Sequence, residues 1–446
     1  MKRFCYRFQK SILFFMMMLL YIGNYVVFFA LLGLKNKQLL NLSRTSVVIT
    51  FSWIIVTCLL TSIYGSYDVG IRKSRPIITS VTLTTLINDV SSYLLLNIMN
   101  RNDDNNKTFK IEFIGIFMCI VIIHIIWITL LTRAGNGFYF LVNEPEDTLV
   151  VLNDMSQEEF MRRIVGVFHK RYKITQVIED TSPLVEEEIS KSKTVFLYNL
   201  PMVRRMELID LCFRKKKNVY FNPQIYDILI QTSMQSLFDD VTFLASRQNT
   251  MTFEQRIIKR LMDIGVSLFA LIITSPIFVI AGIMIKANDG GPVFFRQKRA
   301  TINGNTFTIY KFRTMKPDSA NRSVTQDDDR ITSVGKVLRK YRLDELPQFI
   351  NILKGEMSLV GPRPEMLENV EKYTSQMPEF RYRLRMKAGL TGYAQIVGKY
   401  NTTPADKLVL DLYYIETFSI LRDISLLFQT VLVLLKADDS TEGFKK

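Results

Sequence analysis

Four long apolar stretches near the N-terminus constrain this 446-residue chain more than any other feature. They occupy residues 11–34, 46–64, 76–99 and 112–132. Each approaches the roughly 20 residues that an α-helix needs to cross the ~30 Å hydrocarbon core of a bilayer. We therefore predict a bundle of four transmembrane helices within residues 1–134, and the lipid bilayer is the first expected partner of the chain.

The first stretch follows a basic N-terminus that contains Lys2, Arg3, Arg7 and Lys10. This arrangement resembles a secretory signal, but the apolar stretch is too long and no small-residue cleavage site ends it. We expect a retained anchor. An even number of spans behind a basic N-terminus then places both flanks of the bundle on the cytoplasmic side.

Two ionisable side chains, Asp89 and His124, fall inside the third and fourth stretches. An ionisable group within a membrane span often marks a functional site. A polar contact inside the bundle would also explain each of them. The sequence leaves their function open.

The overall composition requires a soluble part besides the bundle. Charged residues make up 22% of the chain, and 57 Lys+Arg against 42 Asp+Glu give a formal net charge of +15. The four cysteines have no metal-type spacing, so neither a disulfide scaffold nor a cysteine metal site is expected. With His124 and His169 as the two histidines, catalysis by histidine is also not expected.

Residues 135–249 have the pattern of a small α/β domain. Residues 148–152, 194–198 and 218–221 are predicted to be buried strands, separated by segments of helical length. The first strand is followed by Asn153–Ser156 and not by a glycine-rich loop, so the backbone cannot approach a pyrophosphate closely. We predict a Rossmann-like domain without a cofactor motif, with a regulatory or assembly role.

A fifth apolar segment, residues 264–285, contains Ser275 and Pro276 near its centre. The proline removes a backbone donor and crowds the carbonyl of Ile272, and the Ser275 hydroxyl can satisfy the freed carbonyl. Basic residues flank the segment on both sides, which favours entry and exit at the same membrane face. We predict a re-entrant helical hairpin; the alternative, a straight span, would place the last third of the chain outside the cell.

Several cations after this segment are predicted to converge on a phosphate. Residues 293–297 and 307–313 read as short strands that carry Arg296, Lys311 and Arg313, although an edge hairpin with solvated charges is an equal alternative. Arg363 lies in a rigid Gly-Pro-Arg-Pro turn. Residues 381–387 alternate cations with apolar residues, and a strand there would present Arg385 and three other cations on one face. Residues 408–435 read as amphipathic helices on the membrane surface, or as core helices.

Asp344 and Glu345 are the strongest candidates for chemistry. Residues 333–341 have helical spacing, and a second helix is predicted from Pro347 to near Gly355. The two carboxylates then precede a helix N-terminus, which favours anions. A carboxylate nucleophile beside a metal-binding carboxylate can attack a phosphoryl centre. Ordinary acidic residues at a helix start are the alternative.

From about residue 254 onward the chain resembles the bacterial sugar transferases that move a sugar phosphate onto a polyprenyl phosphate. The matching motifs are Lys259-Arg260 with Asp263, Ser275-Pro276, PVFFRQKR at 292–299, FTIYKFRTM at 307–315, DRITSVG at 329–335, LDELPQ at 343–348, MSLVGPRP at 357–364, GLTGYAQ at 389–395 and DLYYIE at 411–416. The resemblance makes residues 250–446 a membrane-associated α/β catalytic domain, and the N-terminal spans match the long members of the family.

The resemblance implies a UDP-sugar donor, an undecaprenyl phosphate acceptor and a requirement for Mg²⁺. Asp344 would attack the sugar-bearing phosphate and expel UMP, and Glu345 would hold the metal ion. The other implied substrate- or phosphate-binding residues are Arg299, Lys311, Arg313, Arg330, Arg363, Arg385 and Gln395, and the membrane hairpin would contain Lys259, Arg260, Asp263, Ser275 and Pro276. The implied location is the cytoplasmic face of the bacterial cytoplasmic membrane, with no nucleic-acid partner.

Two departures from the family pattern, at Tyr393 and Val397, weaken the assignment of the sugar but not of the reaction; glucose or galactose is the default expectation. A nucleotide-sugar dehydratase or epimerase would need the missing glycine-rich loop. An inactive scaffold for polysaccharide export is the other alternative, which the intact Asp344, Glu345 and Arg363 disfavour. The sequence leaves the oligomeric state open, with a homodimer as one option.

Overall fold

The computed structural model describes residues 2–65, 67–104, 113–246, 251–316, 330–397 and 403–435. The chain divides into two compact units, residues 1–222 and 223–446. The first unit contains the N-terminal helices and a parallel sheet, and the second contains the predicted catalytic residues.

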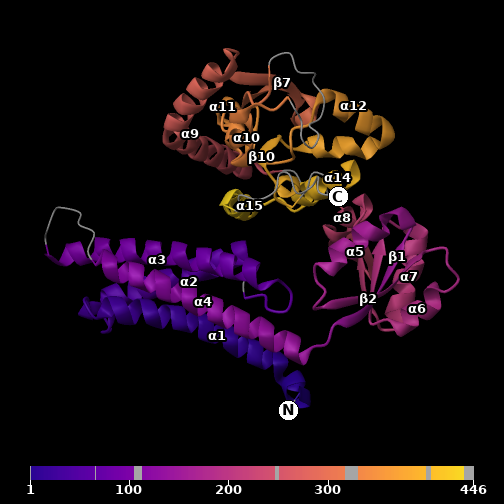
Figure 1. The fold of residues 1–446 in the computed structure, drawn as a ribbon, viewed down its shortest axis with the longest axis horizontal. Helices are drawn as coiled ribbons and strands as arrows, with labels where there is room; N and C mark the ends of the chain where they lie inside the picture. The colour runs from indigo at the N-terminus through magenta and orange to yellow at the C-terminus, as the bar shows by residue number, and fades with distance from the viewer. Residues whose placement is uncertain are drawn as a thin grey trace. The chain divides into compact units, whose positions relative to one another are not determined.

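Four long helices open the first unit, as predicted. They are α1 Lys2–Gly33, α2 Arg44–Tyr64, α3 Ser74–Asp104 and α4 Ile114–Val142, which pack lengthwise as a bundle (Figure 1). Among the described residues, four helices are long and apolar enough to cross a membrane: Cys5–Gly33, Arg44–Tyr64, Ile114–Val142 and Phe253–Asp289. Threonine, serine and asparagine side chains make α3 the most polar of the N-terminal four.

The middle of the chain forms a four-stranded parallel sheet in the order β2-β1-β3-β4. Alternate residues of β1 pack into two cores: Leu149 and Val151 into one, Val150 and Leu152 into the other. Helices therefore cover both faces, which explains the continuous apolar sequence of the strand. The elements are β1 Glu146–Leu152, α5 Glu158–Gly166, β2 Tyr172–Glu179, α6 Val185–Lys191, β3 Thr194–Tyr198, α7 Met202–Arg214 and β4 Asn218–Phe221.

The three predicted strands of this sheet are confirmed, with β3 and β4 at the predicted residues. The sequence reading missed β2, whose burial alternates irregularly because it is an edge strand with polar residues such as Lys173 and Gln176.

The second unit begins with α8 Ile225–Gln231 and the hairpin of β5 Met234–Phe238 with β6 Val241–Ala245. Its strands form small sheets, the antiparallel pair β7–β8 and the parallel pair β9–β10, and helices supply most of the rest. The remaining elements are α9 Phe253–Asp289, β7 Phe294–Ala300, β8 Thr306–Phe312, α10 Ser333–Lys340, the 3₁₀ turn η4 Leu343–Glu345, α11 Gln348–Lys354, β9 Ser358–Val360, α12 Leu367–Gln376, the 3₁₀ segment η5 Pro378–Arg385, β10 Gly389–Thr391, α13 Tyr393–Ile396, α14 Pro404–Glu416 and α15 Ile420–Leu435.

The main core of this unit surrounds β9. Leu359 packs with Ile352 of α11 and with Leu408 and Leu412 of α14, and each of these side chains is at most 1% exposed. Of the two alternatives for residues 408–435, a core helix is therefore correct for α14, whereas Leu421 of α15 is exposed.

Residues 381–387 do not form the strand that would place their four cations on one face. Residues 378–385 form the 3₁₀ segment η5, which starts at Pro378 and buries Phe380 and Arg383, three residues apart. A spacing of three residues places both side chains on one face of a 3₁₀ helix. The burial of this face, and not the alternation of cations and apolar residues, determines the local structure.

Helix α9 contains Pro276 in its interior. The Ser275 hydroxyl donates a hydrogen bond of 2.7 Å to the carbonyl of Ile272, as the sequence predicted. The helix changes direction along its length (Figure 1), as expected where proline interrupts the backbone hydrogen bonds.

Candidate active site

Asp344 and Glu345 lie in a tight turn between two helices. Arg342 has a left-handed backbone conformation with φ of 53° and reverses the chain after α10. The carboxylates follow in η4, Pro347 caps α11, and Gly355 ends that helix with φ of 84°. The predicted position of the pair, directly before a helix that runs from Pro347 to Gly355, is confirmed.

Two cations hold Glu345. Its Oε1 accepts a hydrogen bond of 2.7 Å from Lys311 Nζ and lies 3.5 Å from Arg363 Nη2. Burial raises the pKa of Glu345, but the charges of Lys311 and Arg363 outweigh this effect and bring the pKa to about 2. Glu345 is therefore ionised throughout the physiological range.

Asp344 has the opposite electrostatic environment. Burial and the adjacent charge of Glu345 raise the pKa of Asp344 to about 6, against a smaller opposing effect of Lys311 and Arg339. At neutral pH most of Asp344 is ionised. A carboxylate with a raised pKa is more basic than an ordinary aspartate, which suits a nucleophile that must form a bond.

The register of the β7–β8 hairpin brings two further cations to this turn. Arg299 pairs with Phe307 and Lys311 pairs with Phe295, so Arg299, Ile309 and Lys311 lie on one face of the hairpin. Burial lowers the pKa of Arg299 to about 10, which leaves the guanidinium charged at neutral pH. These residues line one pocket together with Glu345, Gln348, Arg363, Pro364, Gly389 and Leu390.

The loop that carries Arg363 is fixed by backbone contacts on both sides. Gly361 N–H donates to Thr391 O, and Gly389 N–H donates to Pro362 O, both at 2.9 Å. A Cβ on Gly389 would lie 2.0 Å from Gly361 N, so this crossing requires glycine. The Arg363 side chain is 45% exposed and lines the pocket.

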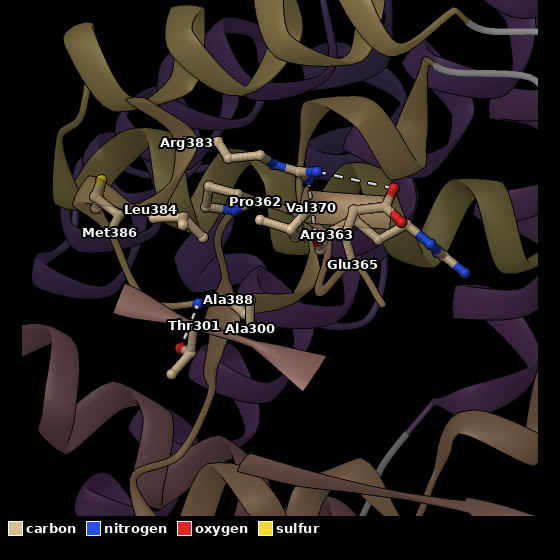
Figure 2. Close-up of a pocket in the computed structure, with 10 residues that line it drawn as sticks. All are labelled: Ala300, Thr301, Pro362, Arg363, Glu365, Val370, Arg383, Leu384, Met386 and Ala388. Carbon is tan, nitrogen blue, oxygen red and sulfur yellow. Dashed lines mark hydrogen bonds and ion pairs between the residues drawn. The ribbon is translucent and has the colours of Figure 1, made fainter. Parts of the chain in front are cut away.

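A second pocket adjoins the first and shares Arg363 (Figure 2). In this pocket Arg383 extends toward Glu365 and donates a hydrogen bond of 2.7 Å to the carbonyl of Arg363. Arg383 is 2% exposed and pairs with Asp411 at 2.7 Å. Burial raises the pKa of Asp411 to about 6 despite this arginine.

Arg383 is the positioning residue that sequence reasoning missed. Its buried ion pair joins η5 to α14 and supports the backbone of Arg363. The pairing spans 28 residues of sequence, and the sequence contains no local pattern that selects Asp411 as the partner.

Four predicted substrate-binding residues do not line the Glu345 pocket. Arg313 pairs with Asp289 and donates to the Pro292 carbonyl, and Arg385 pairs with Glu416 at 2.5 Å. Gln395 donates to the carbonyl of Gly389 at 3.4 Å. Arg330 is 9% exposed, and its carbonyl accepts from Lys316 N–H.

The predicted hairpin residues Lys259, Arg260 and Asp263 attach α9 to the catalytic unit. Lys259 Nζ pairs with Asp423 and donates to the Val360 carbonyl at 3.0 Å. Arg260 donates to the last carbonyls of α11, and Asp263 Oδ1 accepts from Ser358 Oγ and Leu359 N–H at 3.0 and 2.9 Å. Because Val360 precedes the Arg363 loop by three residues, the membrane helix supports the pocket directly.

The chain is similar to known proteins over this unit. Residues 254–437 match the bacterial sugar transferase family. A UDP-N-acetylgalactosamine-undecaprenyl-phosphate N-acetylgalactosaminephosphotransferase of Aeromonas hydrophila is 42% identical over 184 residues, which cover 40% of this chain and 44% of that protein. UDP-glucose:undecaprenyl-phosphate glucose-1-phosphate transferases of Escherichia coli and Caulobacter vibrioides are 31% identical over 283 residues (60% of this chain, 61% of the relative) and 37% identical over 190 residues (41% and 71%).

The chain therefore belongs to the bacterial sugar transferase family. It spans 44% and 61% of the length of the first two relatives. Their names give different sugars, so the comparison does not identify the sugar for this chain.

Replacing Lys259 by Met tests the attachment of α9. Asp423, whose side chain is fully buried, would lose its cation, and breaking a buried ion pair in this way costs about 3–5 kcal/mol. We expect a clear fall in the unfolding temperature of the full chain in detergent, measured by differential scanning calorimetry. Lys336→Met, at an exposed position on α10, is the control and should leave the temperature nearly unchanged. Equal behaviour of the two variants would contradict the assigned role.

Proposed function

We propose that this protein transfers a hexose-1-phosphate from a UDP-sugar to undecaprenyl phosphate and releases UMP, as the first membrane step of capsule, exopolysaccharide or O-antigen synthesis. The observation that carries the proposal is the pocket lined by Glu345, Lys311, Arg299 and Arg363, with Asp344 next to Glu345 in the same turn. The named activities of the relatives support the same reaction class.

In the proposed reaction, a carboxylate oxygen of Asp344 attacks the phosphorus that bears the sugar. The bond from that phosphorus to the bridging oxygen breaks, and UMP leaves with the electron pair. A phosphosugar–aspartate results. An oxygen of undecaprenyl phosphate then attacks the same phosphorus, which regenerates the Asp344 carboxylate and gives the lipid diphosphosugar.

The cations of the pocket would stabilise the charge that moves during both steps. In the structure, Lys311 and Arg363 both pair with Glu345. When the donor binds, both side chains can contact phosphate oxygens in place of Glu345. Arg299 approaches the same face from the neighbouring strand. Charge stabilisation of this kind is the main contribution that a protein makes to phosphoryl transfer.

We propose Mg²⁺ as the cofactor, with Glu345 as its protein ligand. Among the described residues no group of three or more His, Cys, Asp or Glu side chains forms a metal site. Mg²⁺ commonly binds through one or two carboxylates and substrate phosphates, so the donors fit. When bound, the ion would neutralise phosphate charge.

We further propose that α9 is re-entrant and that the catalytic unit lies on the cytoplasmic face. The helix is ~55 Å long at 1.5 Å per residue, yet both of its ends attach to the same unit: Lys259 near the start pairs with Asp423, and Asp289 at the end pairs with Arg313. Apolar side chains between them, such as Phe269 and Ile272, are each 65% exposed. A lipid acceptor and a water-soluble donor can then meet at the membrane surface.

We also propose that the middle domain is Rossmann-like, which its parallel sheet supports, and that it has a regulatory or assembly role. A homodimer remains part of the proposal for the assembled protein.

Asp344→Asn tests the reaction. The amide cannot act as the nucleophile, so we expect UMP release from a panel of UDP-sugars, in the presence of undecaprenyl phosphate and Mg²⁺, to fall about 10³-fold or more. Glu368→Gln, an exposed carboxylate change on α12, is the matched control and should retain full activity. Release of UDP by the wild-type protein would show ordinary glycosyl transfer, and an unaffected Asp344→Asn would exclude the nucleophile.

The rate should depend on pH through Asp344. Its carboxylate must be ionised to attack, and its pKa is about 6, so activity is expected to be full well above this pH and to fall as the pH drops through it. Single-turnover UMP release without the lipid acceptor isolates this group, because the acceptor phosphate also titrates. A flat acid limb down to about pH 4, the ordinary range for aspartate, would contradict the assignment.

Cysteine labelling tests the topology of α9. In a chain whose four cysteines are replaced by serine, Glu254→Cys places an exposed thiol in the first turn of α9, and Asn305→Cys places one after the helix. A re-entrant helix predicts that an impermeant reagent labels both positions from the cytoplasmic side alone. Labelling of the two positions from opposite sides would establish a straight span.

A further inference from the structure

A polar cluster lies inside the N-terminal four-helix bundle, in a part of the chain that the proposed reaction does not use. Asp89 of α3 and His124 of α4 are 1% and 2% exposed, and Asn24 of α1 is 1% exposed. The Asp, Glu, Lys, Arg or His residues within the four apolar stretches of the sequence are Asp89, His124 and, at the first position of the fourth stretch, Glu112. The fold brings Asp89 and His124 together.

The hydrogen bonds of His124 determine how many protons the pair carries. Its Nε2 lies 3.0 Å from the backbone carbonyl of Asn24, and a carbonyl only accepts, so Nε2 carries a hydrogen. Its Nδ1 lies 2.7 Å from Asp89 Oδ2. Two lone pairs would repel at that distance, so one proton lies between them, on either the ring or the carboxyl group. In both arrangements the pair has no net charge.

The cluster contacts all four helices. Asn24 Nδ2 donates to Thr85 of α3 at 3.2 Å. Asn88 Nδ2 donates to Thr57 of α2 at 2.7 Å and to the Trp53 carbonyl at 3.2 Å. These contacts, with the pair itself, link α1, α2, α3 and α4 at one level of the bundle.

Several buried oxygens of the same cluster lack a protein partner. The residues of α3 at positions 85, 88, 89 and 92 lie on one face of the helix because they are three or four residues apart. Buried atoms without a hydrogen-bond partner are Asn24 Oδ1, Asn88 Oδ1, Asp89 Oδ1 and Ser92 Oγ. The amide and carboxyl oxygens need donors, since a buried polar atom without a partner is costly, the more so within a bilayer.

We propose that the bundle encloses a hydrated site in which Asp89 and His124 share one proton and internal water molecules bind the remaining oxygens. Water supplies the donors that three of the four oxygens require, and buried waters usually bind two to four polar groups. A sodium ion would also accept oxygen ligands, but it would bring a charge that the neutral pair does not compensate. The site holds the helices in one register and keeps its proton over the physiological pH range.

The number of histidines makes this proposal directly testable. The chain has two, His124 and His169, and His169 is exposed. The full protein is labelled with ¹⁵N-histidine in lipid nanodiscs, and the nitrogen shifts are followed by NMR between about pH 5 and 9. We expect the His124 nitrogens to keep the same shifts over this range. His169→Asn assigns the signals of His124. A pH-dependent change in the His124 shifts would overturn the shared proton.

Asp89→Asn provides the second measurement. The amide donates to His124 Nδ1, so we expect Nδ1 at the position of an unprotonated ring nitrogen and a protonated Nε2 in this variant. A protonated Nδ1 in this variant would contradict the pairing. If this variant does not fold, the wild-type titration alone decides the question.

Whether water or a cation occupies the site is tested on the wild-type protein. Magnetisation transfer from water to the His124 ring protons is expected, and its absence would overturn the hydrated site. Replacing sodium by choline should leave the His124 shifts unchanged, and a shift would show that the ligand is a cation. These readouts need no turnover, so they stay separate from the UMP assays of the proposed function.

Discussion

The arrangement of the second unit depends on the buried ion pair between Lys259 of α9 and Asp423 of α15. The same ammonium group donates to the Val360 carbonyl, three residues before Arg363. A membrane helix, a C-terminal helix and the loop of the pocket therefore meet at one charged side chain. An unpaired charge here would be expensive, so the three parts hold one fixed geometry. The long apolar helix α9 is thus part of the framework of the pocket.

The second constraint is electrostatic. Glu345 and Asp344 are adjacent in sequence, yet their pKa values diverge. Burial and the charge of Glu345 raise the pKa of Asp344, whereas the charges of Lys311 and Arg363 outweigh burial and lower the pKa of Glu345. One carboxylate remains a permanent anion suited to holding a cation, and the other is more basic and suited to attack. Two neighbouring acids acquire different chemical properties from the β8 strand and the Arg363 loop around them.

Local patterns in the sequence predicted local structure well. The carboxylates before Pro347, the helix end at Gly355, the hairpin strands and the Ser275 hydrogen bond all depend on residues close in sequence. Contacts between distant segments could not be read in the same way. The partners of Arg313, Arg383 and Arg385 lie 24, 28 and 31 residues away along the chain, so nothing nearby shows which cations are free for substrate.

The pairing of β7 with β8 has a consequence for how this family of sequences can vary in length. Arg299 and Lys311 share a face because an even number of residues, 12, separates them across a hairpin with aligned strands. A single inserted or deleted residue within either strand would turn one cation to the opposite face while leaving it in the sequence. Length changes are therefore tolerable in the connecting turn, whereas within the strands they would remove a charge from the pocket without altering composition.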